Sequence, residues 1–443
     1  MKGLVLIYLI TFFGSIAALR KPVIGLLIYV GFAVLRPQFI FGFAGDFGGI
    51  SLYVGIATLI GWAFNGFGSA KLGRGKSIVV SMILYAAWFL ISATQAINTE
   101  IAYAEIEPLA KYVMPFLIGV TLLDDERWQR AMMWVIVLAQ GYVGFEMNLV
   151  YLNGYNVAGE GFGGMDNNCF GVALVSTIGP TFALMLGAKK VWERGLAALA
   201  AALILHTTLL TFSRGAMVGL LCVGFLAFVI MPKNPKHIGA LVMCGLLAVY
   251  FTGPQLAARY ASTLAEEDKR DASAESRIDL WKDCLKVIAE RPIFGVGPGN
   301  FRVVAASLGW PPGKQAHTTW LQTAAENGIP GATLLLLMFG IAAYKIWPMA
   351  RARITDENRY EVAMASGIIM CIVGFVVAGQ FVSLAGLEIP YYVTMIGVVL
   401  LKKNKNVALA PVSATSPAPN RLSTAFPAPG RIGAPAIAGP RRY

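Results

Sequence analysis

The stretch EVAMASGIIMCIVGFVVAGQFV at residues 361–382 is almost entirely apolar, and its only charged residue is the first. A helix needs about 20 such residues to cross the hydrocarbon core of a bilayer. Similar runs recur at about residues 3–19, 22–35, 50–67, 77–95, 108–123, 129–149, 169–187, 195–212, 215–232, 238–255, 329–347 and 386–401. They are continuous and do not alternate with period two, which excludes the strands of a membrane barrel. We therefore expect an all-α polytopic membrane protein with 12 or 13 transmembrane helices, since the short second run leaves the count open.

The composition supports the same class of protein. Of the 443 residues, 57% are hydrophobic and 14% are charged, whereas a soluble chain has about 45–50% apolar and about 25% charged residues. A soluble domain, a disordered protein and a secreted disulfide scaffold are thereby excluded. The five cysteines form no CxxC pair and no Cys/His ligand spacing, so neither a metal nor a cofactor is expected.

The basic residues indicate the orientation in the membrane. Most Lys and Arg fall in alternate connections, beginning with Arg20-Lys21 and ending with Lys402-Lys403 and the arginines of the tail. The positive-inside rule places these connections in the cytoplasm. The net charge of +12 is thus explained by topology, and we expect no nucleic-acid partner. The side on which the N-terminus lies stays open, because it depends on the second run.

Four regions follow from this pattern. Residues 1–254 form an N-terminal transmembrane bundle, 255–328 a large external loop with short helices, and 329–401 the C-terminal transmembrane helices. Residues 402–443 are a Pro/Ala-rich cytoplasmic tail that we expect to be disordered. A connection of more than 70 residues between membrane helices is rarely only a linker, so the large loop is the first place to look for function.

Within the large loop, the spacing of apolar residues predicts an amphipathic helix over 277–290. Ser276 and Asp279 fit a capping box, which would place Arg277 in the first turn. A cation opposes the helix dipole there unless an anion joins it; the alternative is an ordinary surface arginine. Gly295, Gly297 and Gly299 follow. They match no nucleotide-binding fingerprint, and we interpret them as a connector.

His317 is the only histidine of the external loop and precedes a predicted short helix that closes at Asn327-Gly328. Beside a helix N-terminus, the neutral imidazole that a general base requires is favoured. The alternative is a structural histidine that caps this helix. His206, inside an apolar run, is interpreted as a hydrogen-bonded bundle residue, and His237 as a solvated loop residue.

Arg214 lies in a short turn with long apolar runs on both sides. An arginine at the edge of the hydrocarbon is costly unless its side chain reaches the interface or binds an anion. The predicted topology places it on the same side as Arg277 and His317. Two arginines can bind a phosphate or pyrophosphate bidentately, and the histidine can accept a proton.

These motifs resemble the bacterial O-antigen ligase and O-antigen polymerase family of integral-membrane glycosyltransferases. The similarity covers about residues 170–345, and the N-terminal part together with Asp-x-Ser-Ala-x-x-Arg looks most like the exosortase-associated O-glycosylation ligase branch. One departure is Thr318, where the family usually has Asn or Ser. The motifs are Ser213-Arg214-Gly215, Arg277-x3-Trp281, Pro292-x2-Gly295-x-Gly297, and His317-x3-Leu321 followed by Glu-Asn-Gly-Ile-Pro-Gly.

The resemblance implies a multi-pass protein of the bacterial inner membrane with an active site facing the periplasm. Its reaction would be metal-independent transfer of a glycan from an undecaprenyl-pyrophosphate carrier to an acceptor hydroxyl of a glycan, lipid or protein, with inversion. His317 would be the base, and Arg214 and Arg277 would bind the pyrophosphate. Arg259 is a weaker candidate for a further phosphate contact.

Three other functions are considered. A polymerase would use the same carrier and the same loop, so the sequence does not separate it from a ligase. A flippase or transporter would need charged residues in the middle of spans, and only Lys111 and Glu146, near the ends of their runs, come close. A membrane scaffold gives no reason for Arg214, Arg277 and His317 to share one side. The flippase and the scaffold are disfavoured.

Overall fold

The computed structural model describes residues 2–41, 49–231 and 272–403, with the isolated positions 235, 239, 243 and 439. Helices make up this part of the chain, and its only strand-like pairing is an isolated bridge between Phe162 and Met165. The elements are α1 (Lys2–Arg20), α2 (Pro22–Leu35), α3 (Pro37–Ile40), α4 (Ile50–Phe64), η1 (Gly73–Gly75), α5 (Lys76–Thr94), α6 (Thr99–Ala104), α7 (Ile106–Leu122), α8 (Glu126–Leu152), η2 (Val157–Gly159), α9 (Asn167–Gly187), α10 (Val191–Leu210), α11 (Arg214–Ile230), α13 (Ala272–Glu290), α14 (Phe301–Ser307), α15 (Thr319–Ala350), α16 (Arg359–Ala378), η4 (Gly379–Phe381) and α17 (Glu388–Lys403).

Seven of the described helices are long and apolar enough to cross a membrane: Gly3–Arg20, Gly73–Thr94, Glu126–Leu152, Asn167–Gly187, Val191–Leu210, Thr319–Ala350 and Arg359–Phe381. Three shorter apolar helices, α2, α4 and α11, accompany them. The expected all-α polytopic membrane fold is thereby confirmed. The count of 12 or 13 spans stays a prediction, because the run at 238–255 falls almost entirely outside the described residues, as does the predicted tail.

Helices α9 and α16 form the centre of the bundle and pack more extensively with each other than any other pair. Their contact depends on small residues: a Cβ at Gly179 would lie 2.2 Å from the Gly367 carbonyl oxygen. Most of α16 and all of α17 from Ile389 to Leu401 are buried. The bundle is therefore built by close backbone approach around buried, predominantly apolar central helices.

The connections rich in Lys and Arg gather at one end of the bundle, which we name the basic end. Lys402 Nζ donates to the Val120 carbonyl and pairs with Asp124, both at 2.7 Å. Lys345 Nζ donates to the Arg74 carbonyl at 2.9 Å. The end of α1 lies here too, since Asn65 Nδ2 donates to the Leu19 carbonyl at 3.4 Å. The alternation of basic loops in the sequence thus corresponds to one physical end of the molecule.

The other connections gather at the opposite end, which we name the loop end. Ile97 N donates to the Val296 carbonyl at 3.0 Å, and Arg36 pairs with Glu388 at 3.5 Å. The start of α1 also lies here, because Gly3 packs against the Phe41 ring. The sequence left open on which side of the bundle α1 begins, and the structure places the start of α1 at the loop end.

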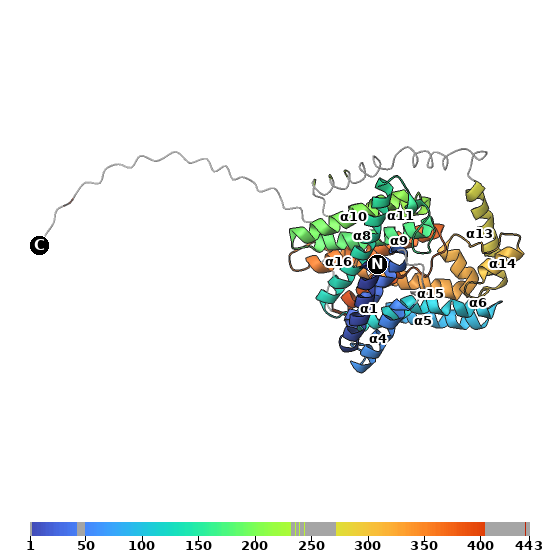
Figure 1. The fold of residues 1–443 in the computed structure, drawn as a ribbon, viewed down its shortest axis with the longest axis horizontal. Coiled ribbons are helices and arrows are strands. Elements are labelled where there is room, and N and C mark those ends of the chain that lie inside the picture. The colour runs from blue at the N-terminus through green and yellow to red at the C-terminus, as the bar shows by residue number, and fades with distance from the viewer. Residues whose placement is uncertain are drawn as a thin grey trace. The chain divides into compact units, whose positions relative to one another are not determined.

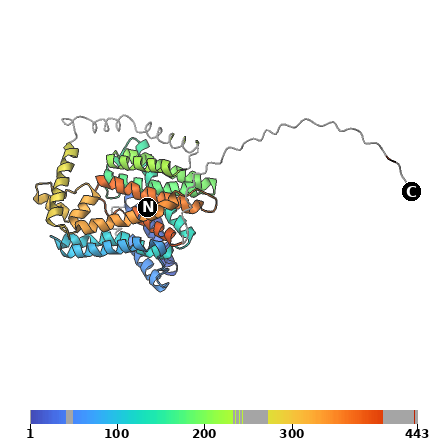
Figure 2. The same cartoon turned by 180° about the vertical axis from the view of Figure 1, so that it is seen from behind.

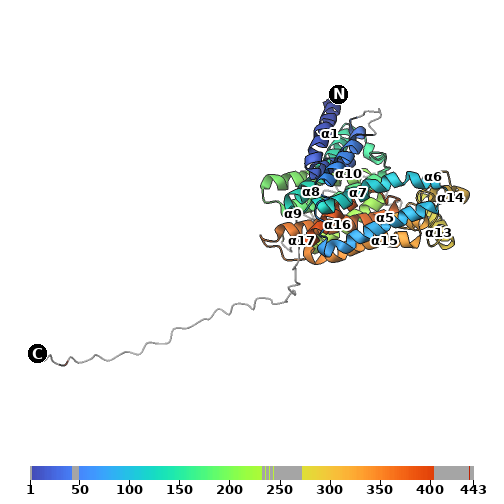
Figure 3. The same ribbon diagram turned by 90° about the horizontal axis from the view of Figure 1, so that it is seen from below.

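Figure 1 shows α13 and α14 beyond the ends of α5 and α15, which run side by side. The same arrangement is seen from behind in Figure 2 and from below in Figure 3. The long helix α15 thus extends from the bundle into the segment that carries the motifs of the large loop.

Candidate functional site

The segment from α13 to the start of α15 forms a small unit at the loop end. Its apolar residues on α13 recur at helical spacing and therefore face one side. Together with the following loops they make a separate core: Leu280, Cys284, Val287, Val296, Phe301, Ala305, Ala316 and Ala325. Because Ala316 belongs to this core, the unit fixes the backbone next to His317.

The capping box predicted at Ser276 is wrong. Helix α13 already includes Ala272, so Ser276 lies inside the helix, and Arg277 lies in the second turn. The Asp279 carboxylate instead accepts from Lys282 Nζ at 2.8 Å. The physical reason is that Ala and Glu, which occur before Ser276, are strong helix formers and extend the helix backwards. The unfavourable interaction between the Arg277 charge and the helix dipole is therefore weaker than predicted, because the effect of the dipole falls off after the first turn.

The glycines after α13 do more than connect two elements, because they let the loop pack closely against neighbouring backbone. Gly295, Gly297 and Gly299 all have positive φ, a conformation that side chains disfavour. A Cβ at Gly295 would lie 2.5 Å from the Ala325 carbonyl oxygen, and one at Gly297 would lie 2.2 Å from Ala96 Cβ. The loop thus lies directly on α15 and on the end of α5.

Gly328 separates the short helix after His317 from the membrane span, as predicted. It has φ 69° and ψ 175° inside α15, and a Cβ there would lie 1.9 Å from the Ile293 carbonyl oxygen. The break turns the Ile329 amide toward the Pro292 carbonyl, to which it donates at 2.8 Å. The loop-end unit and the span are therefore joined by a conformation that requires glycine.

We expect Gly328→Ala to lower the free energy of unfolding by at least about 2 kcal/mol, from the strain of positive φ and the overlap with Ile293. Thermal unfolding in detergent measures the change. The matched control is Gly340→Ala in the same helix, where a Cβ meets nothing within 4 Å; it should leave the protein equally or more stable. Equal unfolding temperatures for the two variants would contradict this account of Gly328.

Two hydrogen bonds hold the peptide that precedes His317. Trp281 Nε1 donates to the Ala316 carbonyl at 3.0 Å, and the Ala316 amide donates to Gln322 Oε1 at 3.1 Å. Arg277 and Trp281 are four residues apart on α13 and so share one face of the helix. The Arg-x3-Trp motif thus places an arginine next to the loop that carries the histidine.

Replacing Trp281 with phenylalanine removes the bond to Ala316, which should loosen residues 314–318. We expect faster hydrogen exchange in this segment and a loss of about 0.5–1.5 kcal/mol in stability. Trp310→Phe is the control, because that indole donates to Asp283 at 2.9 Å in the same unit and makes no hydrogen bond to Ala316. If exchange in 314–318 were unchanged in Trp281→Phe, Trp281 would not be what holds this loop.

His317 is half-buried and has φ 53°, a strained conformation for a residue with a side chain. Burial lowers the pKa of its imidazole below the usual 6.5, and the positive charges of Arg277 and Lys314 lower it further, whereas Asp166 acts in the opposite direction. These charges act on the ring because they lie close to it. The structure therefore brings His317 and Arg277 together, and both the burial and the nearby positive charges favour the neutral imidazole.

His317 does not cap the helix that follows it. The N-cap of α15 is Thr318, and its side chain makes no capping hydrogen bond. The Thr318 hydroxyl is buried and has no hydrogen-bond partner among the described residues. The structural alternative for His317, a capping role, is thus excluded.

Arg214 is the first residue of α11 and is half-buried. Ser213 is the N-cap, and its hydroxyl accepts from the Ala216 amide at 3.3 Å. Gly215 allows this helix end to lie on η4, since a Cβ there would be 2.6 Å from Phe381 Cβ. The next residue of that segment, Val382, accepts a bond from Thr319 Oγ1 at 2.8 Å. Gly215, next to Arg214, and Thr319, two residues after His317, therefore both contact the short segment Phe381–Val382.

Three helices begin in this region, and each N-terminus is the positive end of its helix dipole. Asp166 caps α9, and its carboxylate accepts from the Cys169 amide at 2.7 Å. Asn167 Nδ2 donates to the Thr211 carbonyl at 2.9 Å, which joins the starts of α9 and α11; α15 begins beside His317. Helix N-termini attract anions through their dipoles and unpaired amides. With Arg214 and Arg277, the arrangement suits a phosphate-bearing ligand.

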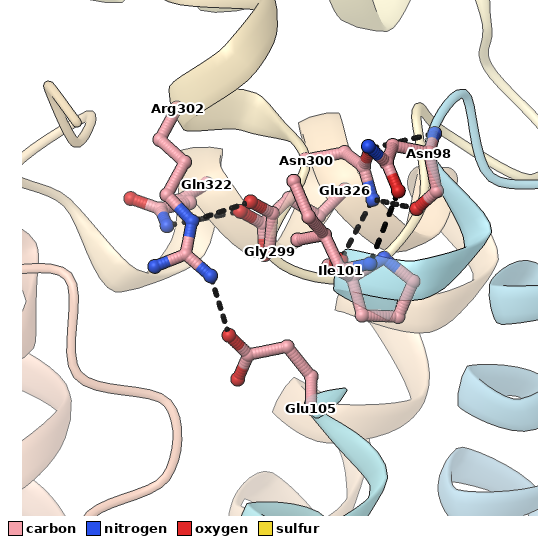
Figure 4. A network of polar contacts seen from close by, with 9 residues as sticks. Asn98, Ile101, Glu105, Gly299, Asn300, Arg302, Gln322 and Glu326 are labelled. Atoms are coloured by element: carbon pink, nitrogen blue, oxygen red, sulfur yellow. Dashed lines mark hydrogen bonds and ion pairs between the residues drawn. The ribbon is translucent and has the colours of Figure 1, made fainter. Parts of the chain in front are cut away.

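A cavity of about 190 Å³ lies beside the His317 loop, with Gln315 and Thr319 in its lining, and sequence reasoning missed it. Its polar lining includes Glu105, Arg302, Gln322 and Glu326. Arg302 Nη2 pairs with Glu105 Oε1 at 3.0 Å, and Gln322 Nε2 donates to Glu326 Oε1 at 3.0 Å (Figure 4). Glu105 and Arg302 are 197 residues apart, so no local pattern signals their contact.

The remaining candidates are resolved only in part. Arg259 and His237 lie outside the described residues. His206 is hydrogen-bonded through Nδ1 to Asn148 Oδ1 inside the bundle, as predicted. Among the described residues, no group of three His, Cys, Asp or Glu side chains is placed to hold a metal ion.

Comparison with known families gives matches over two parts of the chain. Residues 199–336 match a family model described as O-antigen ligase, and these residues include Arg214, Arg277 and His317. Residues 1–162 match a family of unknown function, DUF5935. No curated protein matches the chain significantly.

The fold defines a polytopic all-α membrane protein. Over residues 199–336 it carries an O-antigen ligase domain, which confirms the family resemblance seen in the sequence. The chain is therefore an O-antigen ligase-like membrane enzyme.

Proposed function

We propose that this protein transfers a glycan from an undecaprenyl-pyrophosphate carrier to an acceptor hydroxyl at the loop end, which faces the periplasm of a bacterial inner membrane. The observation that carries the proposal is that His317 lies close to Arg277 in the region where α9, α11 and α15 begin. The O-antigen ligase domain spans all three candidate residues.

In this proposal the pyrophosphate binds between Arg214 and Arg277. Guanidinium groups form paired hydrogen bonds with phosphate oxygens, and the helix N-termini add further positive potential. As the bond between the anomeric carbon and the phosphate oxygen breaks, negative charge grows on the leaving pyrophosphate. The two arginines stabilise that charge in the transition state, so the proposed transfer requires no divalent metal.

His317 acts as the general base. Its neutral imidazole takes the proton of the acceptor hydroxyl while the oxygen attacks the anomeric carbon from the face opposite the pyrophosphate. A new glycosidic bond forms with inversion, the electron pair of the broken bond stays on the pyrophosphate, and the imidazolium later releases its proton to water. The depressed pKa of His317 keeps the base form populated at pH 7.

A transporter is not supported by the placement of charge in the described spans. Lys111 lies near the start of α7, where it pairs with Glu107 at 2.8 Å, and Glu146 lies in the last third of α8. Neither is at the middle of a span. A polymerase stays open as an alternative, because it would use the same donor, arginines and base.

Deletion of the gene in its host distinguishes these possibilities. Loss of a ligase should leave full-length glycan on undecaprenyl pyrophosphate, whereas loss of a polymerase should leave single repeat units on the carrier. Mass spectrometry of extracted lipid-linked glycans measures both, with restoration by the wild-type gene as the control. Unchanged levels of all carrier-linked glycans would contradict the proposed transfer.

A further inference from the structure

We propose that the cavity between Glu105, Arg302 and α15, named here the Glu105 cavity, binds a sugar ring of one of the substrates. This inference rests on the proposed glycan transfer and extends it to substrate recognition. Gln315 and Thr319, each two residues from His317, are part of its lining. A ring held there is next to the loop that carries the proposed base.

The charge of the cavity favours a neutral, hydroxyl-rich ligand over an anion. Arg302 is already paired with Glu105, and Arg302 Nε also donates to the Gly299 carbonyl at 3.0 Å (Figure 4). With Glu326 as a second carboxyl group and no further Lys or Arg in the lining, a pyrophosphate would meet acidic groups. We therefore assign the pyrophosphate to Arg214 and Arg277, which do not line the cavity, and the sugar to the cavity.

Two of the lining residues also carry buried polar atoms without partners among the described residues. Asn327 is 3% exposed, and its Oδ1 has no hydrogen-bond partner among the described residues; the same holds for Ser383 Oγ. Both residues line the cavity. A buried acceptor without a donor is unfavourable, and a sugar hydroxyl that enters the cavity would supply that donor.

The remaining lining and the volume of the cavity are compatible with a sugar ring. Tyr85, Phe89 and Tyr112 supply aromatic surface to the lining, and Gln315, which is exposed, supplies a polar side chain. At about 190 Å³ the space is smaller than the clefts of about 300–1,000 Å³ that hold drug-sized ligands. It therefore holds one ring, with the rest of the glycan outside.

Direct binding of simple sugars tests this inference without turnover. The full chain carrying His317→Ala is placed in detergent with methyl glycosides of glucose, galactose, mannose, rhamnose and N-acetylglucosamine, and saturation-transfer NMR measures binding. We expect at least one glycoside to bind. Adding Glu105→Gln should weaken its affinity about tenfold, the usual loss for one hydrogen bond to a charged group.

Glu107→Gln is the matched control. Its carboxylate lies two residues along the chain, is 77% exposed and pairs with Lys111, outside the cavity; this variant should bind like its parent. Gln315→Ala is the second test variant, because an exposed side chain can be removed without unfolding. Absence of binding for all glycosides, or wild-type affinity in both cavity variants, would overturn the inference.

Steady-state transfer with active enzyme then tells which substrate supplies the ring. In Glu105→Gln, a higher KM for the acceptor assigns the cavity to the acceptor sugar, and a higher KM for the lipid-linked glycan assigns it to the donor. Unchanged KM values for both would contradict the inference. If glycosides bind to the cavity but no transfer occurs with any carrier, the proposed function fails while the sugar site stands.

Discussion

Replacement of His317 by alanine is expected to lower kcat for glycan transfer by about 10²–10⁴-fold, the contribution of a positioned general base. The imidazole is half-buried at a fixed, strained backbone position, and its lowered pKa makes it competent to take the proton at pH 7. Without it, only water is available to accept the proton of the acceptor hydroxyl. Binding of the donor should change little.

The folded state should survive this substitution, because His317 is not the cap of α15 and Thr318 takes that position. Thermal unfolding of His317→Ala in detergent checks this point. His206→Gln is the control, since that histidine lies inside the bundle and bonds to Asn148; it should alter stability more than kcat. If His317→Ala turned over at the wild-type rate, His317 would have no part in the chemistry.

Arg277→Ala should lower kcat by about 10²–10³-fold, as loss of one group that stabilises transition-state charge does. It should also change the pH profile in a defined direction. Arg277 lowers the pKa of His317, so its removal raises that pKa. A base is lost as the pH falls through its pKa, and the acid limb of kcat/KM, expected below pH 6.5 in the wild type, should therefore move to higher pH.

Arg277→Lys separates the two effects. The charge remains, so the acid limb should stay close to the wild-type position, while the paired hydrogen bonds to phosphate are lost and the rate falls. Lys282→Ala, on the exposed side of the same helix, is the control and should leave both rate and profile unchanged. An acid limb at the same pH in Arg277→Ala and the wild type would show that Arg277 does not act on the base.

The fold class and the break at Gly328 inside α15 could be predicted because their signals are local. The run at 361–382 needs only its own composition to predict a span, and it is α16. The break at Gly328 is signalled by Asn-Gly followed by Pro, and the structure places it there. The Arg-x3-Trp spacing places Arg277 and Trp281 on one face of the helix, independently of the rest of the fold.

Other features depended on contacts that a sequence does not display. The start of α13 is a separate case: Ser276 and Asp279 had the spacing of a capping box, but the strong helix formers before them continue the helix, so the spacing alone did not locate its start. The bond between Asn98 and Asn300, with Asn98 N donating to Asn300 Oδ1 at 2.9 Å (Figure 4), joins distant segments. Neither this contact nor the Glu105 cavity has a local pattern that predicts it.

The most direct test of the central claim is transfer by the purified protein in detergent with EDTA present. The donor is an undecaprenyl-pyrophosphate glycan. The acceptors are lipid-core sugars, peptides that contain Ser or Thr, and lipid-linked repeats. The wild type is compared with His317→Ala. The account predicts turnover by the wild type in EDTA and its loss in the variant, and the acceptor that reacts distinguishes ligase from polymerase. Wild-type protein that binds the carrier without consuming it, or full activity in His317→Ala, would contradict it.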